Sequence, residues 1–116
     1  MRKLVRSFGY AWQGLKRAAH HQRNLRIHLG CSFLVVAAGM WFGISVLEWC
    51  LLAIAMGMVI SAELFNSALE ELTDGVSPEK RTWAGHVKDM AAAAVMIIAL
   101  AALAVGLLIF IPRMIP

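Results

Sequence analysis

Three long apolar stretches limit what this chain can fold into more than any other feature. Leu29–Leu47 and Met90–Ile111 contain 19 and 22 residues without a charged side chain. A third run, Trp49–Ala62, has 14 such residues, and its apolar pattern resumes past Glu63 as far as Leu69. About 20 apolar residues span a bilayer as an α-helix, which pairs every backbone N–H and C=O within the segment. The sequence therefore predicts three transmembrane helices, near 29–46, 49–69 and 90–111.

The composition supports an all-α integral membrane protein. Hydrophobic residues make up 60% of the chain and charged residues 16%, whereas soluble domains average about 45–50% and about 25%. These fractions argue against a soluble globular domain and against disorder. The 116 residues are expected to form a single domain, 1–116, too small to enclose a large active-site cleft by itself. Cys31 and Cys50 are interpreted as small buried apolar residues rather than as a disulfide.

Basic residues predict the orientation of the chain in the membrane. Residues 1–26 carry seven Lys and Arg and no acid, and the connection 70–89 carries Lys80, Arg81 and Lys88. Because positive loops stay on the cytoplasmic side, we expect the N-terminus and the 70–89 connection in the cytoplasm. The short hairpin 43–48 and the C-terminus then lie outside. The basic N-terminal segment favours a membrane surface over nucleic acid as its partner, and it lacks the pattern of a signal peptide.

The N-terminal segment has the pattern of an amphipathic helix. Apolar residues share one helical face: Leu4, Val5, Phe8, Trp12, Leu15 and Ala19. Most of the basic residues lie on other faces, as in helices that rest in the membrane interface. The amphipathic pattern covers residues 3–20, and we expect one interface helix over 3–26; the alternative is a cytoplasmic helix that packs on the bundle. Farther along, Gly39 and Gly43 have the spacing that permits close approach of two helices.

Polar side chains form a stripe along the end of the second span. The stripe consists of Glu63, Asn66, Ser67, Glu70 and Asp74, whose spacings of 3, 1, 3 and 4 place them on one helical face. A carboxylate in mid-bilayer costs about 2.5–3.5 kcal/mol, so Glu63 is expected to face protein or water. Such a stripe can simply hold helices together by hydrogen bonds. Three carboxylates exceed what that role needs, and they favour a functional site.

Lys88 and Asp89 stand where the third span begins, at a depth similar to that of the acidic stripe. A lysine at a helix end can merely extend its ammonium to the interface. Next to acids that could hold Mg²⁺ and remove a proton, it instead fits phosphoryl transfer. The glycine-rich loop of P-loop nucleotide-binding proteins is absent from the sequence. The three histidines of the N-terminal half, His20, His21 and His28, are interpreted as interface residues rather than metal ligands.

Two sequence blocks carry a family resemblance. The first is Glu63-Leu-Phe-Asn66-Ser67-Ala68-Leu-Glu70-x-x-x-Asp74, and the second is Lys88-Asp89-Met-Ala-Ala-Ala-Ala94-Val95. Together with Arg23-Asn24-x-x-Ile27-His28 upstream, they resemble the prokaryotic diacylglycerol kinase and undecaprenol kinase family over nearly the whole chain. The resemblance implies a homotrimer in the bacterial inner membrane, with three spans and an interface helix per subunit. It also implies ATP, Mg²⁺, a lipid alcohol acceptor, and active sites shared between subunits at the cytoplasmic side.

The resemblance also implies roles for individual residues. Glu63 would be the general base, Glu70 would bind Mg²⁺, Asn66 would orient the site, and Lys88 would contact the transferred phosphate. Asp74, Asp89 and Tyr10 would help to bind ATP. One position departs from the family pattern, because Gln22 stands where a second metal-binding glutamate is common. Gln22 is therefore a doubtful metal ligand and a candidate nucleotide contact; Glu71 could supply the missing charge.

Several functions fit these residues. The leading prediction is ATP-dependent phosphorylation of undecaprenol to undecaprenyl phosphate, with a diacylglycerol kinase that makes phosphatidic acid as the alternative. The short Leu47-Glu48-Trp49 connection and the Ile-Pro ending resemble the undecaprenol kinases more closely. A more distant alternative is a small proton-coupled transporter that uses Glu63 as its proton relay. An assembly protein without catalytic activity is the third class, and only Gln22 supports it.

Overall fold

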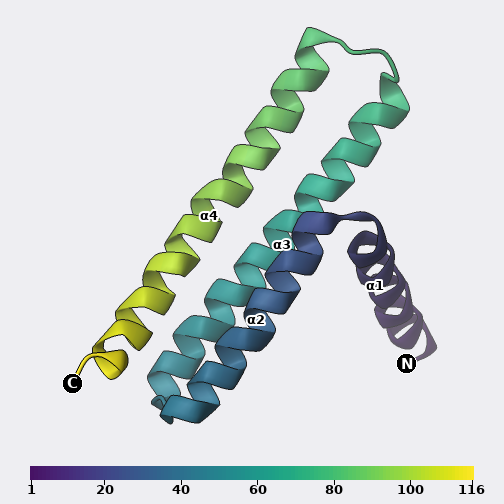
Figure 1. Cartoon of the computed structure of the whole chain (residues 1–116). Helices are drawn as coiled ribbons and strands as arrows, with labels where there is room; N and C mark the ends of the chain where they lie inside the picture. The colour runs from purple at the N-terminus through teal and green to yellow at the C-terminus, as the bar shows by residue number, and fades with distance from the viewer.

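The structure, a computed structural model that describes all of residues 1–116, is entirely helical. Its elements are α1 (Arg2–His21), α2 (Arg23–Phe42), α3 (Val46–Val76) and α4 (Thr82–Met114). α3 and α4 form a long antiparallel hairpin, α2 lies along the first part of α3, and α1 folds away from the start of α2 (Figure 1). The three helices α2, α3 and α4 are long and apolar enough to cross a membrane. The predicted all-helical fold with three spans and an N-terminal helix is thus confirmed.

The prediction of one interface helix over 3–26 is wrong at its end. Gln22 adopts an extended conformation, with φ −108° and ψ 112°, which ends α1 at His21 and starts α2 at Arg23. The guanidinium of Arg26 donates hydrogen bonds to the carbonyl oxygens of Ala19 (2.9 Å) and His20 (2.7 Å). These carbonyls have no partner within α1, so Arg26 stabilises the bend.

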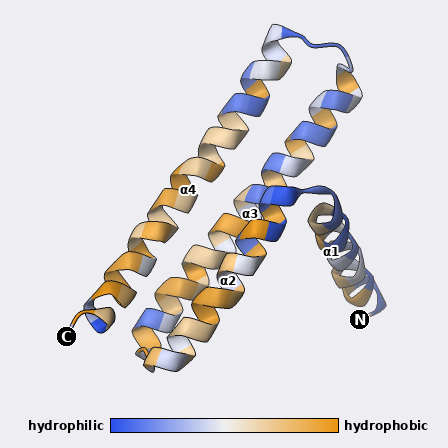
Figure 2. Ribbon diagram, viewed as in Figure 1, coloured by the Kyte–Doolittle hydropathy of each residue, from blue (hydrophilic) through white to orange (hydrophobic).

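The 70–89 connection is also shorter than predicted. α3 continues to Val76 and α4 begins at Thr82, so only residues 77–81 lack helical structure. The helix ends at Ser77-Pro78, because proline disfavours helical structure in the residue before it. Asp74-Gly75, a pair of residue types common in turns, lies within α3. The polar ends of both helices therefore extend beyond the apolar part of the hairpin (Figure 2).

A tight turn joins α2 to α3. Gly43 ends α2 in the left-handed region, with φ 61°, where a side chain would be strained. Ser45 and Glu48 form a reciprocal capping box at the start of α3. Gly39 supplies the predicted close approach, since a Cβ there would lie 2.6 Å from the Trp49 ring. Gly43 does not share this packing role and instead caps α2.

The single chain buries very little. Only 12 of 116 residues are buried, and none of them belongs to α1. The buried apolar cluster near the turn consists of Ile44, Leu52 and Ile109. Contrary to expectation, Cys31 and Cys50 are exposed. The spans consist mostly of hydrophobic residues (Figure 2), and many of their large apolar side chains are exposed. Such a surface requires lipid or other apolar surfaces as its surroundings.

Candidate active site

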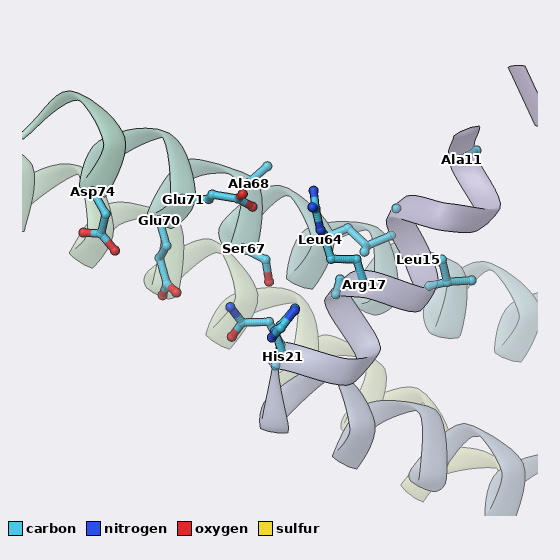
Figure 3. A pocket seen from close by; sticks show the side chains of 13 residues that line it. Ala11, Leu15, Arg17, His21, Leu64, Ser67, Ala68, Glu70, Glu71 and Asp74 are labelled. Atoms are coloured by element: carbon cyan, nitrogen blue, oxygen red, sulfur yellow. The ribbon is translucent and has the colours of Figure 1, made fainter. Parts of the chain in front are cut away.

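A polar cavity of about 860 Å³ lies between α1 and the end of α3. Arg17 and His21 line it from α1, and Glu70 and Asp74 face them from α3 (Figure 3). Gln22 lines the same cavity from the bend between α1 and α2. The volume is within the range typical of small-molecule sites, about 300–1,000 Å³. The fold thus brings Gln22 to the same cavity as Glu70 and Asp74, although Gln22 is far from both in the sequence.

Asn66 lies one turn of α3 before Glu70, which lines this cavity, and the two side chains are hydrogen-bonded. Asn66 Nδ2 donates a hydrogen bond of 3.4 Å to Glu70 Oε1. Asn66 Oδ1 is buried and has no hydrogen-bond partner. An unpaired buried oxygen is costly and calls for a donor or a cation. Carboxylate and amide oxygens are the ligands that Mg²⁺ prefers.

These two residues fit a partial Mg²⁺ site. Nowhere in the chain do three or more His, Cys, Asp or Glu side chains converge to hold a metal ion. Mg²⁺ is usually held by one or two carboxylates together with substrate phosphates and water. The donor set of Glu70 and Asn66, with Glu71 and Asp74 on the same cavity wall, matches that chemistry better than a metal site closed by protein alone.

Glu63 precedes Ser67, Glu70 and Asp74 in α3 and lies nearer the apolar part of the helix than these residues of the polar cavity do. Its side chain is only 3% exposed, and its Oε1 is 3.2 Å from Nε2 of His28 on α2. Seven residues of helix place Glu63 and Glu70 about 10 Å apart along the axis. The two carboxylates therefore lie in different surroundings on one face of α3.

A second cavity, of about 430 Å³, begins beside this pair. His28 lines it together with apolar side chains of α2, α3 and α4, including Val59, Leu103 and Phe110. Of its sixteen lining residues, thirteen are hydrophobic. Along α3, the apolar cavity thus lies beside residues up to Val59, and the polar cavity lies beside residues from Leu64 to Asp74.

Lys88 reaches the stripe from α4. Its Nζ donates a hydrogen bond to Asp74 Oδ1, forming an ion pair between the two long helices. Both side chains are partly exposed, at 38% and 63%. The ammonium therefore lies beside Asp74, which lines the polar cavity.

Tyr10 and Asp89, two of the predicted site residues, do not line the polar cavity. The side chain of Tyr10 is 69% exposed, and Asp89 is exposed at the start of α4. The structure also adds three groups that the sequence pattern did not assign to the site: His28, Arg17 and His21. His28 could have been found from the hairpin register, because His28 and Glu63 lie at similar sequence distances from the turn at 43–45.

Comparisons with known proteins identify the family of this chain. The family model described as prokaryotic diacylglycerol kinase matches residues 9–110. The chain is 31% identical to an undecaprenol kinase of Bacillus subtilis over 114 residues, which cover 98% of this chain and 93% of the relative. It is 36% identical to a diacylglycerol kinase of Synechocystis, over 94% of this chain and 63% of that protein. A diacylglycerol kinase of Escherichia coli is 30% identical, over 82% of this chain and 78% of its own length.

Proposed function

Since this chain belongs to the prokaryotic diacylglycerol kinase family and is a lipid kinase, we propose that it transfers the terminal phosphoryl group of ATP to undecaprenol. The products are undecaprenyl phosphate and ADP, and the hydroxyl proton is released. The observation that carries this proposal is the buried carboxylate of Glu63, which lies on α3 between the residues that line the apolar cavity and those that line the charged, polar cavity. A lipid alcohol and a nucleotide need those two environments.

In this proposal Glu63 is the general base. Its carboxylate accepts the proton of the lipid hydroxyl as the oxygen attacks the terminal phosphorus of ATP. The apolar cavity beside His28 takes the first part of the hydrocarbon chain, which keeps the hydroxyl near Glu63 and away from bulk water. The transporter alternative has no support in the comparisons, because the family and the relatives are kinases.

The nucleotide occupies the polar cavity. Glu70 and Asn66 would hold Mg²⁺, which would offset the negative charge of the phosphates. Gln22 lies on the opposite wall and can add one neutral oxygen. Lys88 leaves Asp74 to contact the transferred phosphoryl group, and Asp74, Asp89 and Tyr10 bind the rest of the nucleotide.

We propose a homotrimer with shared active sites and a cytoplasmic N-terminus. The small buried core and the exposed apolar surfaces of the spans leave room for subunit contacts. The exposed positions of Tyr10 and Asp89 fit a site completed by a neighbouring subunit. Light scattering of the detergent-solubilised protein should give the mass of three 12.7 kDa chains; a monomeric, active enzyme would contradict the shared site.

One experiment tests the choice of acceptor. Labelled ATP and the purified protein are mixed with detergent micelles that contain undecaprenol, diacylglycerol, or both in equal amounts. We expect undecaprenol to be the better acceptor, as the match to an undecaprenol kinase over 93% of its length suggests. Faster formation of phosphatidic acid would instead favour the alternative, a diacylglycerol kinase, which two of the relatives exemplify.

A further inference from the structure

The contact between His28 and Glu63 joins a titratable side chain of α2 to the polar stripe of α3. Nε2 of His28 lies 3.2 Å from Oε1 of Glu63, within hydrogen-bond distance. The imidazole is 25% exposed, whereas the carboxylate is 3% exposed. His28 also lines the apolar cavity, so the pair stands where that cavity meets the stripe.

A buried carboxylate needs such a partner. Placing a charged or polar group in apolar surroundings without a hydrogen bond is strongly unfavourable. A neutral imidazole with its proton on Nε2 donates to Oε1 and leaves Oε2 free to accept another proton. The backbone of Glu63 is fixed as well, because the Ser67 hydroxyl donates to its carbonyl oxygen at 2.9 Å. The carboxylate is thus fixed at one oxygen and free at the other.

We propose that His28 is a positioning residue for Glu63. Its Nε2–H fixes the orientation of the carboxylate so that Oε2 faces the hydroxyl of the lipid alcohol arriving through the apolar cavity. His28 itself neither gains nor loses a proton in this step. This inference rests on the proposed function, in which Glu63 is the general base.

Three substitutions of His28 separate the effect of its hydrogen-bond donor from the effect of its side-chain volume. His28→Gln places an amide N–H at the same distance from the backbone, His28→Asn holds the same amide one methylene short, and His28→Leu keeps similar volume without a donor. A misplacement of about 1 Å can cost a reaction on the order of 10²-fold. We therefore expect kcat to fall about 10²-fold in His28→Asn and His28→Leu, and less than about five-fold in His28→Gln.

The kinetic constants and a matched control distinguish positioning from a general loss of structure. KM for ATP should stay within about two-fold in folded variants, because His28 does not line the polar cavity. His86→Leu, at an exposed histidine near the start of α4, should leave kcat unchanged. If His28→Leu does not fold, the comparison of His28→Gln with His28→Asn still decides. Equal kcat values for these two variants would overturn the proposal.

A spectroscopic measurement does not depend on turnover. The ¹⁵N chemical shift of Nε2 in labelled protein reports its proton and its hydrogen-bond partner. We expect this shift to change in Glu63→Gln and to stay the same in Glu79→Gln, an exposed acid in the 77–81 turn. An unchanged shift in Glu63→Gln would overturn the contact even if the enzyme used another substrate. Failure of the parent to phosphorylate any lipid alcohol, with the shift change present, would overturn only the proposed function.

Discussion

At the residue scale, the surroundings of each carboxylate decide what chemistry it can perform. Glu63 and Glu70 occupy one face of α3, yet Glu63 is buried against His28 and Glu70 lines a polar cavity. A buried carboxylate with one free oxygen suits proton removal, and a carboxylate near water and an unpaired amide oxygen suits a hard cation. Three substitutions test this division of roles.

Glu63→Gln should abolish nearly all phosphoryl transfer without disturbing assembly. The amide has the same shape, but it carries no charge and cannot take the proton of the lipid hydroxyl. General-base catalysis contributes about 10²–10⁴-fold, so turnover should fall by that factor. Steady-state rates with undecaprenol and the elution volume in detergent are measured together. A variant that keeps a rate within a few-fold of the parent would exclude Glu63 as the base.

Lys88→Ala should lower kcat more than it raises KM for the lipid. Lys88 is paired with Asp74, which lines the polar cavity. Its ammonium can leave Asp74 and form a hydrogen bond with a phosphoryl oxygen instead. Lys80→Ala is the matched control, because Lys80 lies exposed in the 77–81 turn. If the two variants have the same kcat, Lys88 serves only as a surface lysine at a helix end.

Gln22→Glu should lower the Mg²⁺ concentration required for half-maximal activity. Gln22 lines the same cavity as Glu70, and a second carboxylate there adds charge to a site that prefers carboxylate oxygens. Mg²⁺ is titrated at saturating ATP for the parent, for Gln22→Glu and for Gln13→Glu, an exposed position on α1 outside the cavity. A half-maximal concentration that stays the same or rises in Gln22→Glu would argue against a metal-ligand position.

At the scale of the helices, the close contact between α2 and α3 depends on one glycine. A Cβ at Gly39 would lie 2.6 Å from the Trp49 ring and 3.1 Å from Ile44. This contact near the turn sets how the two helices pack, and with it the depth at which His28 meets Glu63.

Gly39→Ala should therefore destabilise the protein. Overpacking costs about 1–3 kcal/mol, and the better helix propensity of alanine returns up to about 1 kcal/mol. We expect a net loss of about 1–2 kcal/mol in the free energy of unfolding, measured by denaturant titration in micelles. Gly57→Ala, in α3 where no atom lies within 4 Å of the added carbon, should be neutral or stabilising. A stable Gly39→Ala variant would mean that Trp49 is free to move aside.

At the scale of the whole molecule, one ion pair joins the start of α3 to the end of α4, at the open end of the hairpin that these two helices form. Arg113 near the end of α4 donates to both carboxylate oxygens of Glu48, at 2.5 and 2.6 Å. Glu48 lies in the first turn of α3, before its apolar membrane-spanning part. The hydrogen bonds from Arg113 and from the Ser45 backbone lower the pKa of Glu48 from 4.5 to about 2.

This pair predicts how stability depends on pH. Because the pKa of Glu48 is lower in the folded state, its contribution is complete above pH 4.5 and is lost as the pH falls through about 2. Glu48→Gln should therefore lower Tm at pH 7, and the difference from the parent should shrink as the pH is lowered from 4.5. Thermal scans in detergent over this range measure it. A difference in Tm that does not vary with pH would show that the charge of Glu48 is not its cause, since Gln can also complete a capping box.

The sequence by itself determined the spans and most of the polar stripe. Runs of apolar residues must become helices in lipid, because a free backbone group finds no partner there. A spacing of three and four residues fixes which side chains share a face of one helix, so Glu63, Asn66, Glu70 and Asp74 could be grouped from their positions in the chain alone. These inferences are local, and they depend only on helix geometry and on the cost of burying polar groups.

Only the tertiary structure decided which helices meet the stripe and at what depth. The bend at Gln22, stabilised by Arg26, brings α1 against α3 and forms the polar cavity. The packing of α2 on α3 places His28 beside Glu63, although 35 positions separate 28 from 63 in the sequence. Helix ends were predicted less well, because a polar helix can continue beyond the membrane as long as its own hydrogen bonds are satisfied. Contacts between helices arise from side-chain packing in three dimensions. The periodicity of a single helix shows which residues share a face, but it does not show which residues of another helix that face contacts.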